Sequence, residues 1–365
     1  MISFKDTKVL VVGGAGFIGS NLVLRLLADS PAKICIVDNL LSSQIESVPE
    51  HPTIEFIYGS IADDRILEGL GSDFDYAFHL ACFHGNQSSI ADPIADHDNN
   101  TVTSLKLFNR LKDHGALKKV VYAAAGCAVA QKTFAAATAT PEDAPVSLFH
   151  DSPYSISKLV GEMYANYFFL RYKLPIVKTR FQNIYGPREI LGAGQWRGTL
   201  HTVWRNVIPT FIWKALHKEA LPLENRGEAS RDFVYVEDLV EGLYRAALRG
   251  EPGEVYNLAS GQQTKIYDLA RLIDQLSGND TPIELRPART WDRSGSRFGL
   301  TEKSKRVLGF EATTSMCDGL AKTIAWTQEN RDLIGQCIAR HNYFLAHPRT
   351  GHPCWLGREP EKPWE

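Results

Sequence analysis

The sequence contains no long apolar stretch. No uninterrupted apolar run approaches the roughly 18 residues that a membrane-spanning helix needs, and the opening residues, MISFKDTKVLVVGG, enter a strand pattern without the regions of a signal peptide. The six cysteines form no CxxC pair and no Cys/His spacing typical of a metal site. We therefore expect a cytoplasmic protein with free thiols, no membrane partner and no metal.

The sequence also lacks an excess of either charge. Its 40 Lys and Arg residues are balanced by 42 Asp and Glu residues, which leaves a net charge of -2. Such a balance gives no electrostatic reason to expect nucleic acid as a partner, so small-molecule chemistry is favoured. At about 150 residues per domain, 365 residues suggest two domains, or one large domain with a smaller lobe.

Short apolar runs alternate with amphipathic stretches through the first half of the chain. The runs cover 9–14, 34–38, 54–59, 76–81 and 119–125. The helix-like stretches between them cover 17–29, 63–70, 97–113 and 152–172. Continuously apolar strands are typical of a parallel sheet that helices cover on both faces. The pattern predicts an α/β fold with a Rossmann, doubly wound parallel sheet.

The alternation of strands and helices ends after residue 185, where loops rich in Pro and Gly separate the predicted elements. Two short strands are expected at 233–236 and 254–259, and helices at 199–218, 236–248, 265–277 and 317–330. We divide the chain into a dinucleotide-binding domain at 1–185, to which some later segments return, a smaller C-terminal α/β substrate lobe at 186–335 and an extension at 336–365.

A glycine-rich turn directly follows the first apolar run and opens a helix. Gly13 permits the tight turn, Gly16 lets the backbone approach a pyrophosphate, and Gly19 lets the helix lie close to the sheet. Asp38 ends the second run, where its carboxylate can bind the ribose hydroxyls of an adenosine and repel a 2'-phosphate. The sequence therefore predicts that the cofactor is NAD.

Tyr154 and Lys158 are four residues apart on a predicted helix and therefore share a face. A cation beside a phenol favours the phenolate, so we expect the pKa of Tyr154 to fall and its phenolate to act as a base.

With these features, residues 7–330 resemble the extended short-chain dehydrogenase/reductases, the family of nucleotide-sugar epimerases and dehydratases. The matching segments are VDNL at 37–40, HLA at 79–81, DHDNN ending at Asn100, RFQNIYGP at 180–187, NVIP at 206–209, RDFVYVEDLVEG at 231–242, YNLASG at 256–261 and RPA at 287–289.

The resemblance implies a mechanism. Tyr154 takes the proton from the sugar O4 while a hydride passes from C4 to NAD, and Lys158 binds the nicotinamide ribose. The resulting 4-ketone acidifies the neighbouring carbons or lets the ring turn, and the hydride then returns. The residues implied to contact the cofactor are Gly13, Gly16, Phe17, Ile18, Gly19, Asp38, Asn39, Leu40, Ser60, Ile61, Leu80, Ala81, Cys82, Asn100, Tyr154, Lys158 and Phe181.

The resemblance also implies a nucleotide diphosphate sugar as substrate and a homodimer formed by the helices at 97–113 and 152–172. The residues implied to hold the substrate are His84, Asn183, Arg197, Asn206, Arg231 and Arg289. Arg231 and Arg289 suit the diphosphate and nucleoside because guanidinium groups are planar and permanently charged.

The chain departs from the family pattern at its catalytic strand. Ala125 occupies the position of the usual Ser or Thr, so direct transfer from the sugar O4 to Tyr154, or a bridging water, must replace that hydroxyl. Cys127 follows where the 4,6-dehydratases have Glu and some related enzymes have a proton-transferring Cys, and we predict that it is catalytic. Arg197 lies where the 3,5-epimerases have Lys, and we expect it to bind or polarise a substrate oxygen. Lys132 is a further candidate acid, and Ser60 replaces an Asp that often contacts the adenine.

The sequence thus predicts an NAD-dependent nucleotide-sugar epimerase with a transient 4-keto intermediate. A nucleotide-sugar 4,6- or 5,6-dehydratase, in which Cys127 begins an elimination, is the alternative. The loss of the hydroxyl at Ala125 also leaves open a catalytically silent NAD-binding scaffold.

Overall fold

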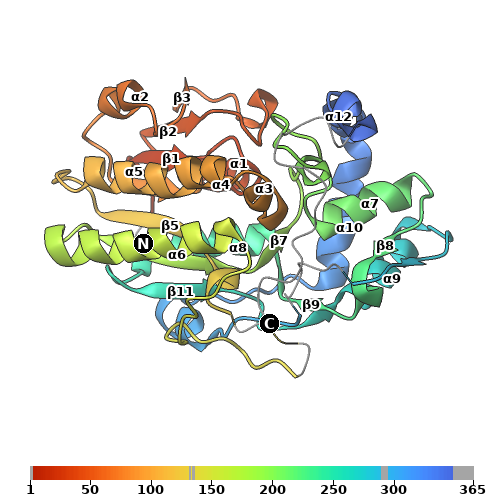
Figure 1. Cartoon of the computed structure of the whole chain (residues 1–365). Coiled ribbons are helices and arrows are strands. Elements are labelled where there is room, and N and C mark those ends of the chain that lie inside the picture. The colour runs from red at the N-terminus through yellow and green to blue at the C-terminus, as the bar shows by residue number, and fades with distance from the viewer. Residues whose placement is uncertain (1–2, 131–132, 134–135, 289–294, 348–365) are drawn as a thin grey trace.

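A computed structural model describes residues 3–130, 133, 136–288 and 295–347, which form a large sheet domain with a smaller lobe beside it (Figure 1). The sheet has seven parallel strands in the order β11-β6-β5-β4-β1-β2-β3. Their bounds are β1 Lys8–Val12, β2 Lys33–Asp38, β3 Ile54–Tyr58, β4 Tyr76–His79, β5 Lys119–Ala125, β6 Ile176–Phe181 and β11 Val255–Leu258. This doubly wound order confirms the predicted Rossmann fold.

Helices cover both faces of the sheet, which explains why its strands are continuously apolar. In β1, Val9 and Val11 belong to a core with one pair of helices, whereas Leu10 and Val12 belong to a core with another pair. The first pair is α1 Phe17–Leu27 and α8 Val236–Arg249, and the second is α5 Thr103–Leu111 and α6 Pro153–Tyr172. The shorter helices α2 Asp64–Gly69, α3 Asn86–Ala91 and α4 Pro93–Asp96 connect the strands.

The smaller lobe contains three helices around its own core. They are α7 Val207–Leu216, α9 Ile266–Ser277 and α10 Met316–Glu329. Three strand pairs accompany them: β7 Asn183–Tyr185 with β10 Phe233–Tyr235, β8 Pro222–Leu223 with β13 Glu284–Leu285, and β9 Ser230–Arg231 with β12 Thr264–Lys265.

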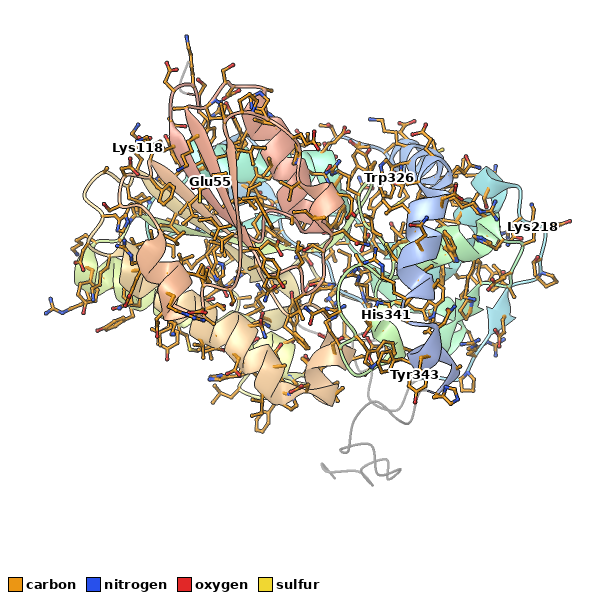
Figure 2. All side chains as sticks on the ribbon, turned by 90° about the horizontal axis from the view of Figure 1, so that it is seen from above. Glu55, Lys118, Lys218, Trp326, His341 and Tyr343 are labelled. Carbon is orange, nitrogen blue, oxygen red and sulfur yellow. The ribbon has the colours of Figure 1, made fainter. Side chains whose placement is uncertain are left out.

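Two further helices, α11 Arg331–Ala339 and α12 Asn342–Ala346, lie against the loop that follows β7. Trp196 of that loop stacks on Phe344, with ring centroids 4.8 Å apart. Figure 2 shows Trp326, His341 and Tyr343 of the C-terminal part of the chain on one side of the molecule and Glu55 and Lys118 of the sheet domain on the other. The predicted boundary at residue 335 falls inside α11.

Three details differ from the sequence-based expectations. The strand β6 was not among the predicted strands because Lys178 and Arg180 interrupt its apolar pattern; both are buried with polar partners. The segment 97–113 contains a π-helical turn, His97–Val102, before α5 begins. The segment 199–218 is helical only from Val207 onward, after a short 3-10 turn, because the backbone of Asn206 is extended.

Among the described residues, no helix has both the length and the apolar character needed to cross a bilayer. The five described cysteines are free, as expected, and Cys354 lies outside the described residues.

Candidate functional site

A cavity of about 400 Å³ lies along the carboxyl ends of the sheet strands and extends to the smaller lobe. The cofactor residues predicted from the sequence that line it are Gly13, Gly16, Phe17, Ile18, Gly19, Asp38, Asn39, Ser60, Ile61, Leu80, Ala81, Cys82, Tyr154, Lys158 and Phe181. The other predicted residues on its wall are His84, Cys127, Asn183, Asn206 and Arg231. Tertiary structure therefore brings together residues from 13 to 231 of the chain at the edge where such folds bind ligands.

The glycine-rich turn leaves space that no side chain could share. A Cβ on Gly13, whose φ is +86°, would lie 2.5 Å from the backbone nitrogen of Ala81. A Cβ on Gly19 would lie 2.1 Å from the carbonyl oxygen of Gly13, so only glycine allows α1 to approach the turn this closely. Gly16 is the N-cap of α1, and the free backbone amides of this helix end suit a pyrophosphate.

Asp38 ends β2 at the wall of the cavity. Its carboxylate accepts hydrogen bonds from the amides of Ala15 and Leu40, at 3.0 and 2.9 Å, and from the hydroxyl of Ser43 at 3.0 Å. Burial raises the pKa of Asp38, and these hydrogen bonds oppose the shift by favouring the charged form. A carboxylate at this place fits the ribose of NAD, whereas Leu40 itself does not line the cavity.

Asn100 also lies away from the cavity wall, behind the loop that carries His84. Its side-chain oxygen accepts a hydrogen bond from the amide of Phe83 at 2.7 Å, and its nitrogen donates to Asp96 and Ser157. Asn100 therefore supports the wall of the site from inside the π-helical turn.

Tyr154 and Lys158 enter the cavity from the first turns of α6. Ser152 caps this helix by accepting a hydrogen bond from the amide of Ser155, and Pro153 occupies its first turn. The ammonium group of Lys158 donates to the carbonyl of Ala123 at 2.9 Å. These contacts hold both side chains at the end of β5.

The expected fall in the pKa of Tyr154 is wrong for the protein alone. Burial raises the pKa of the phenol well above its ordinary value, and the nearby thiols of Cys82 and Cys127 add to this shift. The physical reason is that a phenolate loses its hydration in this pocket.

Ala125 ends the strand β5, and Cys127 lies in the 3-10 turn Gly126–Ala128 that follows it. Both pack in a small cluster with Tyr154 and Leu159, and both line the cavity. The thiol is partly exposed, as a proton-transfer group must be. Ala125 leaves an apolar wall where the family has a hydroxyl, and Lys132 lies outside the described residues.

His84 is the third functional group around Tyr154. Its ring meets the Tyr154 ring edge-on, with centroids 5.8 Å apart and an interplanar angle of 83°. Burial lowers the pKa of His84 to about 4, and the charges of Arg205, Arg197 and Lys158 add to this shift, so the imidazole is neutral near pH 7.

Arg197 does not line the cavity. Its guanidinium lies behind His84 and donates to the carbonyl oxygen of that residue at 3.1 Å. Burial lowers the pKa of Arg197 to about 9, and its Nε and Nη2 atoms have no hydrogen-bond partner among the described residues. In this position the side chain orients the His84 loop.

Of the two arginines expected at the nucleotide, the structure describes Arg231. Arg231 lines the cavity and donates to the carbonyl oxygens of Ser230 and Gly295. Arg289 lies outside the described residues. Arg297, which sequence reasoning missed, lines the cavity and has a buried Nη1 atom without a partner among the described residues. It is a second cation suited to a diphosphate.

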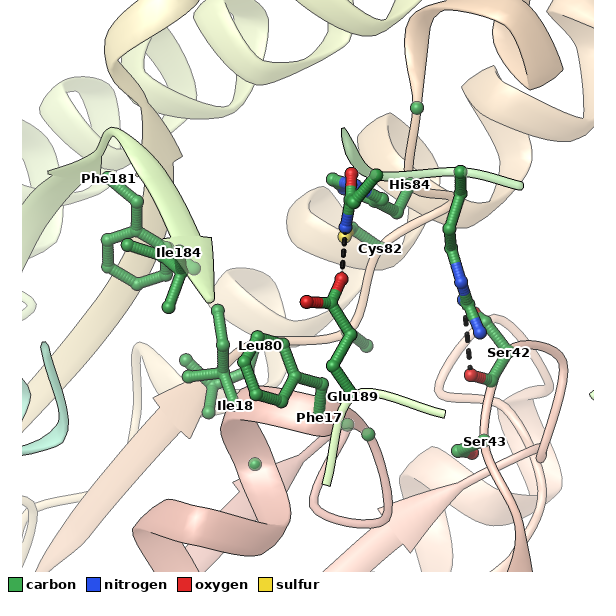
Figure 3. A pocket seen from close by; sticks show the side chains of 18 of the residues that line it. Phe17, Ile18, Ser42, Ser43, Leu80, Cys82, His84, Phe181, Ile184 and Glu189 are labelled. Atoms are coloured by element: carbon green, nitrogen blue, oxygen red, sulfur yellow. Dashed lines mark hydrogen bonds between the residues drawn. The ribbon is translucent and has the colours of Figure 1, made fainter. Parts of the chain in front are cut away.

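Sequence reasoning also missed Glu189, Arg188 and Arg205, which line the same cavity. Figure 3 shows Glu189 extending from the loop after β7 toward Cys82 and His84. Glu189 follows the segment RFQNIYGP after a single residue, Arg188. This closeness to a family motif was the sequence signal that could have identified Glu189 as a site residue. Nothing in the local pattern around Arg297 distinguished it.

Comparison with known proteins agrees with this geometry. The sequence profile of the NAD dependent epimerase/dehydratase family matches residues 9–259. The chain is 31% identical to the UDP-glucose 4-epimerase of Mycolicibacterium smegmatis over 322 residues, 87% of this chain and 97% of that protein.

The trifunctional UDP-glucose 4,6-dehydratase/UDP-4-keto-6-deoxy-D-glucose 3,5-epimerase/UDP-4-keto-L-rhamnose-reductase RHM2 of Arabidopsis thaliana is 27% identical over 360 residues. The alignment covers 95% of this chain but only 50% of that enzyme, so the chain spans about half the length of this relative.

Among solved structures, the Bordetella bronchiseptica enzyme WbmF in complex with NAD+ is 52% identical, with a TM-score of 0.85. The match covers 94% of this chain and 99% of that one. WbmF has also been solved in complex with NAD+ and UDP.

Proposed function

Since the chain belongs to the NAD-dependent epimerase/dehydratase family, we propose that it is a nucleotide-sugar epimerase that acts through a transient 4-keto intermediate. One observation carries this proposal: the glycine-rich turn, Tyr154, Lys158 and Cys127 line one cavity. The UDP and NAD+ complexes of WbmF support the same ligand classes for this chain.

The residues on the cavity wall fit NAD. The turn at Gly13 and the start of α1 suit its pyrophosphate, Asp38 suits the adenosine ribose, and Lys158 suits the nicotinamide ribose. When bound, NAD would supply a reversible acceptor for the hydride from C4 of the sugar.

Tyr154 accepts the proton of the sugar O4 when C4 is oxidised. Its side chain is partly buried, so the charge of the buried Lys158 counts more than it would in water. Ala125 supplies no hydroxyl between Tyr154 and the substrate, and the proton must pass directly or through a water. Cys127 lies in the same cluster and is placed to remove a proton from a carbon beside the 4-ketone.

A nucleotide-sugar dehydratase is the second candidate, favoured by the same position of Cys127. After formation of the 4-ketone, this residue as a thiolate would take a proton from the carbon beside the ketone, and the hydroxyl group on the next carbon would leave as water with a proton from solvent. A silent scaffold is disfavoured because Tyr154 and Lys158 both face the cavity.

The proposal is tested with the purified protein and a panel of UDP-, GDP-, CDP- and dTDP-sugars in deuterated water. We expect an isomer that has gained deuterium at C3 or C5, or an isomer inverted at C4, by mass spectrometry and NMR. A product lighter by one water supports the dehydratase. Bound NAD without reduced-cofactor absorbance or any product across the panel contradicts both enzymes.

We also propose a cytoplasmic homodimer. The outward face of α6 is apolar: Ile156, Met163, Tyr167 and Leu170 are 48%, 52%, 50% and 67% exposed and recur at helical spacing. A second copy of this helix would cover the face. The free thiols support the location.

The dimer is tested by placing charge on this face. Replacing Met163 and Leu170 together by Glu is expected to convert a dimer into a monomer in light scattering, because the interface would bury unpaired carboxylates. Leu285→Glu, in the exposed strand β13, is the control and is expected to leave the mass unchanged. An unchanged dimer in the double variant would place the interface elsewhere.

A further inference from the structure

The buried carboxyl group of Glu189 belongs to a hydrogen-bonded chain that runs through Asn206 to His84, whose ring meets the Tyr154 ring edge-on. Glu189 is 7% exposed, and its Oε1 atom accepts a hydrogen bond from the side-chain amide of Asn206 (Figure 3). Its Oε2 atom is buried without a partner among the described residues. A buried carboxyl oxygen without a hydrogen-bond partner costs free energy, so this group calls for an explanation.

Asn206 occupies a position where its side chain would ordinarily cap a helix. It is the N-cap residue of α7, yet its side chain makes no capping hydrogen bond. Its Nδ2 atom faces Glu189, and its Oδ1 atom lies 3.3 Å from Nε2 of His84. The amide therefore links the two residues instead of stabilising its own helix.

The side-chain amide of Asn206 has one donating and one accepting end. The group that faces one end therefore determines whether the other end donates or accepts. A carboxylate at Glu189 only accepts, which turns the Nδ2 end of Asn206 toward it. The Oδ1 end must then accept from His84, which requires the imidazole proton to be on Nε2. The Nδ1 atom, which makes no hydrogen bond among the described residues, becomes an acceptor.

We propose that Glu189 is a positioning residue that sets, through Asn206, which nitrogen of His84 carries the proton, so that Nδ1 accepts a hydrogen bond from a sugar hydroxyl beside Tyr154. The proposal rests on the proposed function because it assigns a sugar to this part of the cavity. It supplies an acceptor near Tyr154 where Ala125 provides no hydroxyl.

The charges around the chain support this arrangement. Arg205 is the charged group that faces Glu189, and Arg205, Arg197 and Lys158 face His84. Burial, assisted by these three cations, keeps the imidazole neutral, and a neutral imidazole is needed for one nitrogen to accept.

Protonation of Glu189 reverses the direction of the hydrogen bonds that join it through Asn206 to His84. Burial raises the pKa of Glu189 to about 7. As the pH falls through that value, the carboxyl group takes a proton from solvent and its O–H can donate to the amide oxygen of Asn206. The amide then turns and donates to Nε2 of His84, whose proton moves to Nδ1 through solvent. His84 stays neutral and presents a donor where it presented an acceptor.

The first test observes the His84 ring directly in the full-length, substrate-free protein. With ¹⁵N-labelled histidine, two-bond ¹H–¹⁵N spectra distinguish the two neutral tautomers, and His84→Gln assigns the signal among the 11 histidines. We expect the proton on Nε2 at pH 8.5 and on Nδ1 at pH 6. In Glu189→Gln the tautomer ratio should be the same at both pH values, because the residue at 189 no longer titrates.

A double variant supplies the rescue. Adding Asn206→Asp to Glu189→Gln moves the carboxylate one step along the chain, where it accepts from Nε2 of His84. We expect the Nε2 proton to be restored at pH 8.5. Glu68→Gln, on the exposed face of α2, is the matched control and should behave as the wild type. A His84 tautomer that ignores both pH and Glu189→Gln overturns the proposal.

Kinetics separate this proposal from the proposed function. For a nucleotide sugar that is turned over, wild-type kcat should rise about 10-fold between pH 6 and 8.5, following the ionisation of one group near 7. In Glu189→Gln the change should be less than about 2-fold. A pH-dependent tautomer without turnover of any nucleotide sugar refutes the proposed function alone. A lower kcat in Glu189→Gln with an unaltered, pH-dependent tautomer shows direct action of Glu189 and overturns the positioning role.

Discussion

Tyr154→Phe is expected to lower the rate of C4 oxidation by about 10²- to 10⁴-fold, the usual contribution of a positioned proton-transfer group. The variant keeps the ring that packs beside His84 but has no group to receive the O4 proton. Reduced-cofactor absorbance after mixing with substrate measures the effect. Cofactor content should be unchanged, and Tyr58→Phe, at a 64% exposed site, is the control. Rapid oxidation in the variant would exclude Tyr154 as the base.

Cys127→Ser separates the second chemical step from the first. We expect this variant to oxidise C4 normally, since Tyr154 and Lys158 remain, and to stop before proton removal from the neighbouring carbon. The absorbance of the reduced cofactor should appear while deuterium incorporation is lost. Cys317→Ser, at an exposed free thiol, is the control. Loss of C4 oxidation in both Tyr154→Phe and Cys127→Ser would refute the assignment of oxidation to Tyr154 and of the later proton removal to Cys127.

A large effect on stability is expected from the buried ion pair between Glu162 and Arg180. Glu162 of α6 accepts two hydrogen bonds from the guanidinium of Arg180 in β6, at 2.9 and 2.8 Å, and both side chains are 6% exposed. Glu162→Ala leaves Arg180 buried and unpaired, so we expect the free energy of unfolding to fall by about 3–5 kcal/mol. Chemical denaturation measures this loss.

Two variants test the cause of that loss. Glu55→Ala breaks the exposed pair with Lys33 and should cost less than about 1 kcal/mol. Removing Arg180 together with Glu162 should recover part of the stability, because no uncompensated charge stays buried. An unfolding free energy that is equal in Glu162→Ala and the wild type would show that the pair does not hold α6 on the sheet.

The parts of the site that depend on short segments were accessible to sequence reasoning. The turn from Gly13 to Gly19 and the pair of Tyr154 and Lys158 were recognised because their spacing within one turn or one helix determines their geometry.

Strands β1 to β5 of the sheet followed from their apolar runs. The strand at 254–259 was expected in the region of the smaller lobe, but it joins the sheet as β11. Strand β6 was missed because Lys178 and Arg180 conceal a buried strand behind charged residues. Lys178 and Arg180 can be buried in that strand because Gly253 and Glu162, which are distant in sequence, pair with them. A local sequence pattern contains no information about such partners.

The sequence by itself determined the fold class and the residues of the cofactor turn, because periodicity and spacing act through local backbone geometry. Only the tertiary structure decided the pKa direction of Tyr154, since burial raises that pKa and the nearby thiols of Cys82 and Cys127 add to the shift. It likewise placed Arg197 behind His84 and joined that histidine to Glu189, more than 100 residues away. Hydration, charge and hydrogen-bond direction depend on which atoms surround a group, and those neighbours exist only after the chain has folded.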